Sequence, residues 1–354
     1  MLAFKYISFH YLKYFFIILI ALIMFMVGFD YLQNVNDLPK SANILLIYLV
    51  YRVFFAIDML LPLALVFAMI STKIYLIRSN ALVSFYSLGY SRTDVLKPFI
   101  YVSTLIILLF ISAHATNFAR ADEFANNIRK TQQYLNPTRD LFFTYEDKYI
   151  YFGQLSPLQK KATDVRVFSV ENGNLKEMIS STEALYQGGD WHLKDAHIIK
   201  KPSIVGPAKN GIEMSDVPDL AMLHDFKPKI LDQVYEGKVN FTIGDAIDAL
   251  YLFQHQKINT SQIKSSLYKI FIYPFFVPAL IVIIFFFVPT SGRFLNVSLF
   301  SFAAILSTLV VWGLIFMMIE YANNKSVSSE VGIVLPVFIL LILSMVQYKR
   351  FNIR

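Results

Sequence analysis

The side chains in this sequence that could do chemistry are few and scattered. Asp245 and Asp248 lie one helical turn apart, a spacing that suits paired catalytic carboxylates, although a solvated helix face explains it more simply. The histidines lack the spacing of metal ligands, and they are His10, His114, His192, His197, His224 and His255. We therefore predict no catalytic residues and no metal site.

The sequence also lacks the motifs of several enzyme classes. It contains no GxxxxGK[ST] phosphate-binding loop, no HExxH zinc motif and no GxSxG nucleophile elbow. Because there is no cysteine, disulfide scaffolds, zinc–thiolate sites and cysteine nucleophiles are excluded. We predict that the chain binds no cofactor, so any energised work must draw on another chain.

Composition indicates an integral membrane protein. Of 354 residues, 56% are hydrophobic and 16% are charged, and the mean hydropathy is +0.51. Soluble domains have roughly 45–50% apolar and about 25% charged residues, so a soluble or disordered chain does not fit. A bundle of membrane helices with one extramembrane domain fits this composition.

Six apolar stretches approach the roughly 20 residues that cross a bilayer. We expect spans at about 14–32, 50–72, 99–118, 270–289, 297–319 and 331–347. The first is too long for a cleaved signal peptide. The predicted organisation is a first membrane half (1–118), an inserted domain (119–241), and a connecting helix with a second membrane half (242–354).

Basic residues predict the orientation. With a cytoplasmic N-terminus, the inside segments hold one acid, Asp94, against many basic residues. These are Lys5, Lys13, Lys73, Arg78, Arg92, Lys97, Arg293, Lys349, Arg350 and Arg354. The middle segment, 119–269, has equal numbers of acidic and basic residues. We expect both termini in the cytoplasm and the inserted domain outside, and no nucleic-acid binding, because the excess charge reports topology.

The inserted domain has the alternation of β-strands. Phe142–Tyr145 and Tyr149–Phe152 flank a short polar turn, which predicts a hairpin. Further strands are expected at Val165–Val170, Leu175–Tyr186, Trp191–Leu193 and His197–Ile199. This spacing favours a sandwich or an open barrel. Residues 202–220 are expected to form a loop, and residues 242–266 to be helical.

A short segment between the second and third spans carries an apolar, aromatic face. Leu82, Phe85 and Tyr86 recur at helical spacing, Gly89 is expected to end the helix, and Ser91 to cap the next one. The predicted helix covers 78–89 and runs parallel to the membrane. It is either an interfacial helix lying on lipid or a coupling helix that docks into a nucleotide-binding subunit.

These residues carry a resemblance to a known family. Leu82–Arg92, which ends in Ser-Leu-Gly-Tyr-Ser-Arg, resembles the coupling-helix motif of the lipopolysaccharide export permeases, the LptF/LptG family. Leu60–Leu63, with its proline, resembles the family's second span, and Ala125–Arg129 its exit helix. Leu267–Ile270 followed by Pro274 is similar to the entry of the fourth span in the LptG branch. The resemblance covers essentially the whole chain.

The resemblance implies an inner-membrane permease subunit of an ABC transporter, closer to LptG, with six transmembrane helices and a periplasmic jelly-roll-like domain. Its implied partners are a homologous LptF-like subunit, an LptB-like cytoplasmic ATPase dimer that uses ATP and magnesium, a periplasmic LptC/LptA-like bridge, and lipopolysaccharide. The implied docking residues are Arg78, Ala81, Leu82, Phe85, Tyr86, Gly89 and Arg92. Ala81 stands where the family usually has a glutamate, so docking would rest on apolar shape and on Arg78 or Arg92.

A permease for a phosphorylated and acylated lipid needs an apolar surface with cations near the outer leaflet, and ionisable residues inside spans are functional candidates. The candidates are Phe25, Met26, Phe29, Lys40, Arg52, Arg120, Arg129 and Lys130. Arg129 matches a basic residue of the family's exit helix, where phosphate contact is implied. Arg52 snorkelling to the outer interface is an open alternative, as is ordinary lipid exposure of the apolar residues.

Two other functions remain open from the sequence. One is a permease of a different ABC system with a large outside domain, which predicts a four-span core or a different order of motifs. The other is a non-transporting assembly or sensor protein whose β-domain only binds a partner. Association of an ATPase with the segment around Gly89 separates the transporters from the last alternative.

Overall fold

The computed structural model divides the chain into two compact units. The helical unit comprises Met1–Arg129 and Lys264–Arg354, and the second unit comprises Lys130–Ile263. The structure describes the chain apart from residues 1, 132–137, 146–147, 158, 172, 202–210, 225, 229–239, 254–259, 288–295 and 353–354. Arg293 and Arg354, used above to predict orientation, and the expected end of the fourth span at 289 lie outside the described residues.

The helical unit contains six helices that are long and apolar enough to cross a membrane. They are α1 (Leu2–Asn34), α2 (Ala42–Arg78), α4 (Arg92–Ala113), α8 (Ser261–Phe271) with α9 (Phe276–Phe287), α10 (Val297–Asn323), and the π-helical turn η4 (Glu330–Val334) with α11 (Leu335–Asn352). The shorter elements are α3 (Ala81–Ser87), η1 (Asn117–Arg120), α5 (Ala121–Thr131) and η2 (Tyr273–Phe275). The prediction of six spans is confirmed.

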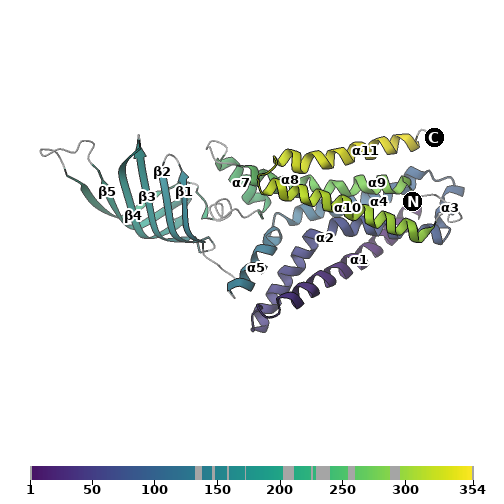
Figure 1. Cartoon of the computed structure of the whole chain (residues 1–354), viewed down its shortest axis with the longest axis horizontal. Helices are drawn as coiled ribbons and strands as arrows, with labels where there is room; N and C mark the ends of the chain where they lie inside the picture. Colours follow the sequence, from purple (N-terminus) through teal and green to yellow (C-terminus); the bar gives the residue numbers. More distant parts are fainter. Residues whose placement is uncertain are drawn as a thin grey trace. The chain divides into compact units, whose positions relative to one another are not determined.

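The short helices mark the two ends of the helical unit (Figure 1). The α3 helix lies at the same end as both chain termini. The α5 helix, within which the chain leaves this unit, lies at the other end together with the connection between α1 and α2. We therefore call one end of the unit the α3 end and the other the α5 end.

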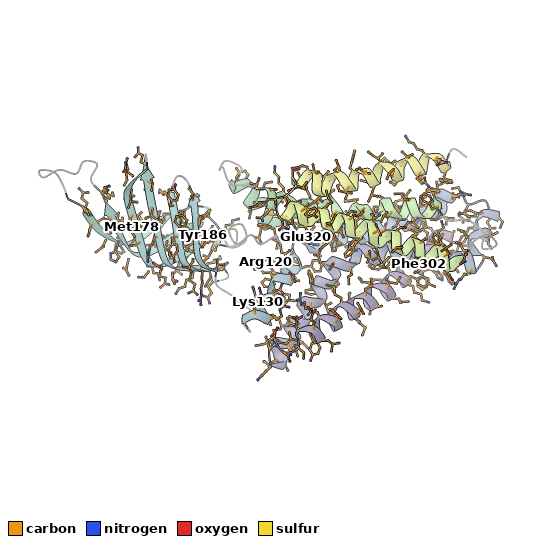
Figure 2. The ribbon with its side chains drawn as sticks, viewed as in Figure 1. Arg120, Lys130, Met178, Tyr186, Phe302 and Glu320 are labelled. Atoms are coloured by element: carbon orange, nitrogen blue, oxygen red, sulfur yellow. The ribbon has the colours of Figure 1, made fainter. Side chains whose placement is uncertain are left out.

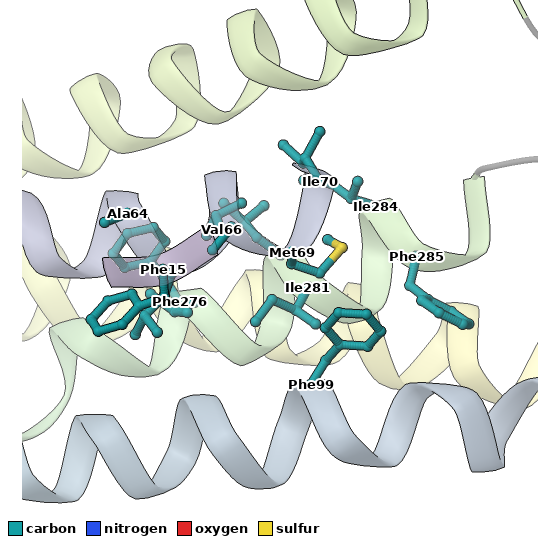
Figure 3. Close-up of a cluster of buried hydrophobic side chains, with 14 of the residues drawn as sticks. Phe15, Ala64, Val66, Met69, Ile70, Phe99, Phe276, Ile281, Ile284 and Phe285 are labelled. Carbon is teal, nitrogen blue, oxygen red and sulfur yellow. The ribbon is translucent and has the colours of Figure 1, made fainter. Parts of the chain in front are cut away.

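The core of the helical unit is built around α2 and α9. Met69 on α2, Phe99 on α4 and Ile281 on α9 are almost completely buried and lie in one cluster (Figure 3). The most apolar window of α2 is 61% buried, whereas that of α1 is 11% buried. Much of the α1 surface therefore meets lipid or another chain rather than this core.

The second unit contains a six-stranded antiparallel sheet. Its strands are β1 (Thr138–Tyr145), β2 (Lys148–Ser156), β3 (Lys161–Glu171), β4 (Asn174–Gln187), β5 (Asp190–Lys200) and β6 (Glu213–Met222), hydrogen-bonded in chain order. The predicted hairpin is the β1–β2 pair, in which Phe143 pairs with Ile150. The β-domain is confirmed, but the described strands form a meander and lack the crossovers that a jelly-roll requires.

One strand was not predicted. Residues 213–220 were expected in a loop, whereas they form most of β6. The segment contains Pro218, which has no backbone N–H, and β6 lies at the edge of the sheet, where one side of the strand needs no hydrogen-bonded partner. The position at the edge explains why a proline-containing polar segment is a strand.

Aromatic side chains hold one face of the sheet together. Trp191 is fully buried, and its Nε1 donates a hydrogen bond to the carbonyl of Phe226 at 2.8 Å. The ring centroids of Phe152 and Trp191 are 5.2 Å apart, and those of Phe143 and Phe226 are 5.0 Å apart. After the sheet, α7 (Ile243–Phe253) and the start of α8 confirm the predicted change to helical structure, and residues 254–259 lie outside the described part.

The approach of η4 to α10 gives a testable prediction. A Cβ atom on Gly332 would lie 2.8 Å from the Met318 carbonyl oxygen and 2.8 Å from the Ala322 Cβ. Gly332→Ala should therefore destabilise the protein by about 1–3 kcal/mol through overpacking. The measurement is thermal unfolding in detergent. Gly313→Ala is the matched control, because nothing lies within 4 Å of its added Cβ, and equal unfolding temperatures for the two variants would contradict this packing.

Candidate functional site

The α3 helix is fixed between two tight backbone turns. The α2 helix ends at Arg78, and Asn80 adopts a left-handed conformation, with a φ of 57°, before α3 begins. At the other end Gly89 has a φ of 88°, its N–H donates to the Tyr86 carbonyl, and the Tyr90 N–H donates to the Phe85 carbonyl. This is the Schellman arrangement, which favours glycine. The predicted stop at Gly89 is confirmed.

The next helix begins as predicted. Ser91 caps α4 by accepting a hydrogen bond from the Asp94 N–H, and the Asp94 carboxylate accepts one from the Ser91 N–H. Such a capping box satisfies two backbone donors at once. Four residues, 88–91, therefore lie between α3 and α4, and the two hydrogen-bonded caps tightly constrain their path.

The apolar face of α3 points toward the helical unit. Leu82 is fully buried, and Phe85 and Tyr86 pack against the same core. The Phe85 ring makes edge contacts with Tyr6 and Tyr90, each with centroids 6.0 Å apart. The sequence assigned this face to docking, and that assignment stays a prediction: Leu82 has no exposed surface for a partner, whereas Phe85 and Tyr86 are half-buried. The observed α3 helix begins later than the predicted helix 78–89, because Arg78 belongs to α2.

The burial of Tyr86 has an electrostatic consequence. Burial raises the pKa of Tyr86 to about 12, and the neighbouring Arg92 offsets part of this effect. The phenol, already neutral at physiological pH, therefore stays protonated into more alkaline solution than an exposed tyrosine. Arg92 itself is exposed, and its guanidinium lies 6.0 Å from the centroid of the Phe351 ring near the end of α11.

The outward surface around α3 mixes apolar side chains with cations. Val83 is 46% exposed and Leu88 is 73% exposed, while Ala81 is half-buried. Arg78 and Arg92 are exposed at either side of α3. We name Arg78, Val83, Leu88 and Arg92 the α3 surface. It offers apolar contact and positive charge to a partner.

A buried lysine closes the α3 end of the core. Lys73 on α2 is 2% exposed. Its Nζ donates to the backbone carbonyl of Phe285, and it lies 3.8 Å from the centroid of the Phe285 ring. Phe285 is in the last turn of α9, where carbonyl groups lack partners within the helix. Lys73 therefore binds the C-terminal turn of α9 rather than facing the surface.

Arg52 is the centre of a charge network at the α5 end. Its guanidinium is 3.0 Å from the Asp30 carboxylate and 2.9 Å from that of Asp122, and its side chain is 9% exposed. The Tyr48 hydroxyl accepts from the Arg52 Nε at 3.2 Å and donates to Asp30. The network joins α1, α2 and α5, so the charge of Arg52 is compensated inside the unit.

Arg129 extends this network. It donates to the Asn34 side chain at 2.8 Å and to the Asn126 side chain at 3.3 Å. Asn126 also donates to the Asp122 carboxylate at 3.1 Å. The contact with Asn34 gives α5 a second connection to α1, and α5 is anchored to the helical unit although the sequence placed it in the inserted domain.

A second ionic cluster lies within the spans. Asp58 on α2 accepts from the His114 Nε2 at 2.9 Å, and the Lys269 Nζ lies 3.5 Å from its other oxygen. The cluster joins α2, the end of α4 and α8. Nearby, the Trp312 Nε1 donates to the Tyr273 hydroxyl at 2.9 Å, which links α10 to η2.

The remaining predicted cations fall into two groups. Arg120 is 5% exposed and makes two hydrogen bonds to Glu123, at 2.8 Å and 2.9 Å. Lys40 and Lys130 are exposed, and within the described chain neither has a hydrogen-bond or ion-pair partner. Arg120 and Lys130 lie near opposite ends of the η1–α5 segment (Figure 2). Lys40 and Lys130 are therefore the predicted cations with charge available to a ligand.

The predicted apolar contacts lie on the outer surface of α1. Phe25 is 75% exposed and Phe29 is 61% exposed, and their rings stack with centroids 6.4 Å apart. Met26 is half-buried. In the part of the chain that the structure describes, no group of three His, Cys, Asp or Glu side chains could hold a metal ion.

Six membrane-crossing helices with an inserted antiparallel β-domain define a multi-pass membrane protein with a large extramembrane insert. The family model described as "Lipopolysaccharide export system permease LptF/LptG" matches residues 5–350, and the chain belongs to this family. No curated protein sequence matches the chain.

Sequence reasoning missed the partners of the buried charges. Arg52 was a candidate, but Asp30 and Asp122, which compensate it, were not, and the hydrogen bond between His114 and Asp58 was not predicted. Ionisable residues inside apolar spans were the available signal, because such residues are costly unless paired. The sequence gives no distance between helices, so it could not assign the pairs.

The charge network at the α5 end gives the second prediction. Arg52→Met should destabilise the protein by about 3–5 kcal/mol, because it leaves the carboxylates of Asp30 and Asp122 without their buried partner. Thermal unfolding in detergent measures the effect. Lys40→Met removes an exposed lysine at the same end and serves as the control. If both variants unfold like the wild type, the network does not hold α1, α2 and α5 together.

Proposed function

We propose that this protein is one permease subunit of an ABC transporter that extracts lipopolysaccharide from the inner membrane. The observation that carries the proposal is the family match over residues 5–350. The N- and C-termini and α3 would face the cytoplasm, and the β-domain would lie in the periplasm. The basic residues Lys5, Lys349 and Arg350 near the termini support this orientation, since cytoplasmic segments are enriched in Lys and Arg.

The α3 surface would dock into a cytoplasmic ATPase dimer. Val83 and Leu88 supply exposed apolar contact, and Arg78 and Arg92 suit a groove that carries acids. The inward residues Leu82, Phe85 and Tyr86 would hold α3 against the spans, so that motion of the ATPase reaches the membrane helices. ATP and magnesium would be bound by the ATPase, and this chain would catalyse no bond change.

The exposed face of α1 would contact the acyl chains of the cargo. Phe25 and Phe29 give an apolar surface near the α5 end, and Lys40 at that end carries charge for phosphate groups. A homologous permease subunit would cover the exposed face of α1 and enclose a cavity for the lipid. The low burial of α1, whose apolar window is 11% buried, fits this arrangement. The β-domain would then pass the lipid to a periplasmic bridge protein.

The docking proposal is tested at Leu88. Leu88→Arg should reduce co-purification of the ATPase by about tenfold or more, because burying one leucine at an interface contributes about 1.5–3 kcal/mol. Leu2→Arg, at a leucine of the same end that is 84% exposed, is the control. An ATPase that stays bound to the Leu88→Arg variant would exclude the α3 surface as the docking site.

The lipid-contact proposal is tested by photocrosslinking. A photoreactive residue at position 25 should crosslink lipopolysaccharide, whereas one at Phe302, an exposed phenylalanine of α10, should crosslink much less. Lys40→Ala should lower crosslinking at position 25 about fivefold, since one lysine near an anionic surface contributes about 1 kcal/mol. Lys13→Ala, at the α3 end, is the control. Crosslinking that Lys40→Ala leaves unchanged rejects that residue as a phosphate contact.

A further inference from the structure

An apolar groove lies on the outside of the helical unit, near its α3 end. It has a volume of about 360 Å³. The groove is lined by α4, α9 and α11, through Leu96, Ile100, Pro278, Ala279, Val282, Leu341, Ser344, Met345, Tyr348 and Lys349. None of these residues belongs to the candidate cargo surface on α1 or to the α3 surface.

The groove exists because small side chains form its floor. Both α4 and α11 pack against α9, which lies between them. Pro278 and Ala279 on α9 and Ser344 on α11 fill little of the space between the helices. The Ser344 hydroxyl donates to the Leu341 carbonyl of its own helix at 2.7 Å, so it does not offer its proton to a ligand. The apolar lining of the groove is therefore suited to a hydrocarbon chain.

One end of the groove carries a free cation. Lys349 is exposed, and within the described residues it has no hydrogen-bond or ion-pair partner. Arg350 follows it in the last turn of α11 and is also exposed. A groove that is apolar except for a cation at one end can bind an amphipathic molecule that has a hydrocarbon tail and an anionic head. An apolar transmembrane helix of a partner chain would bring no anionic group to Lys349.

We propose that this groove binds an anionic glycerophospholipid of the cytoplasmic leaflet. One acyl chain would lie along Ile100, Ala279 and Val282, and the phosphate would be bound by Lys349. The assignment to the cytoplasmic leaflet rests on the orientation given in the proposed function. The binding of an anionic lipid does not, because it follows from the apolar groove and Lys349. The lipid is distinct from the cargo, which contacts α1 and the opposite end.

The test is lipid retention by the full-length chain purified with its accompanying subunits. The complex is reconstituted in nanodiscs of equal parts phosphatidylglycerol and phosphatidylethanolamine, released gently, and analysed by native mass spectrometry. The wild type should retain phosphatidylglycerol in preference. Lys349→Ala should lower that retention about fivefold, and Val282→Phe, which narrows the groove, should lower retention of both lipids.

Matched controls lie elsewhere on the same unit. Lys13→Ala removes an exposed lysine of the α3 end, and Val310→Phe enlarges a lipid-facing valine of α10 that is 52% exposed. Equal retention of the two lipids by the wild type, or equal losses in variants and controls, would overturn the proposal, as would crosslinking of a partner helix to position 282.

Two readouts separate this inference from the proposed function. Lipopolysaccharide crosslinking at position 25 should persist in Lys349→Ala, because the two surfaces are distinct. If phospholipid retention is lost there while cargo crosslinking remains, the groove is an independent site. Reaction of Lys349 with a membrane-impermeant amine reagent in intact cells would overturn the leaflet assignment and the orientation, without bearing on whether the groove binds lipid.

Discussion

The structure depends on the absence of water from the bilayer interior, where an ionised group is costly unless a partner compensates it. The α2 helix carries the consequences, since it holds Arg52, Asp58 and Lys73 along a mostly buried length. Arg52 binds acids of α1 and α5, Asp58 binds His114 and Lys269, and Lys73 binds the end of α9. Each charge therefore fixes a neighbour, and α2 organises the helical unit through its polar residues as much as through its apolar ones.

The two ends of the unit are built differently from these interactions. At the α5 end, ion pairs and amide hydrogen bonds hold α5 to α1 and α2, so the segment that precedes the β-domain is anchored before the sheet begins. At the α3 end, aromatic packing prevails: Phe85 contacts Tyr6 and Tyr90, and Tyr75 stacks on His10 with centroids 4.7 Å apart. Polar contacts suit the headgroup region near the proposed cargo surface, and the aromatic contacts leave Val83 and Leu88 on the outward side of α3 exposed.

Local patterns predicted the elements, and contacts between distant residues explain what was missed. Six spans and most strands follow from hydrophobic length and alternation, and the turn at Gly89 follows from the backbone conformation that glycine permits. The stripe of Leu82, Phe85 and Tyr86 identified an apolar face of α3 without revealing that Leu82 is fully buried against the spans while Phe85 and Tyr86 are half-buried. The β6 strand was missed because an exposed edge strand with Pro218 has little hydrophobic alternation. The remaining candidate contacts with lipid and ATPase are predictions.

The corner between α3 and α4 has a mechanical consequence. The Schellman turn at Gly89 and the capping box at Ser91 leave the backbone between the two helices little freedom to move. In the proposed function, a displacement of Leu88 by a docked ATPase would therefore move α4 directly, because no long loop lies between α3 and α4 to absorb it. His114 follows the last residue of α4 and is hydrogen-bonded to Asp58 on α2, so α2 would receive the same displacement. The segment between α3 and α4 would then act as a rigid joint.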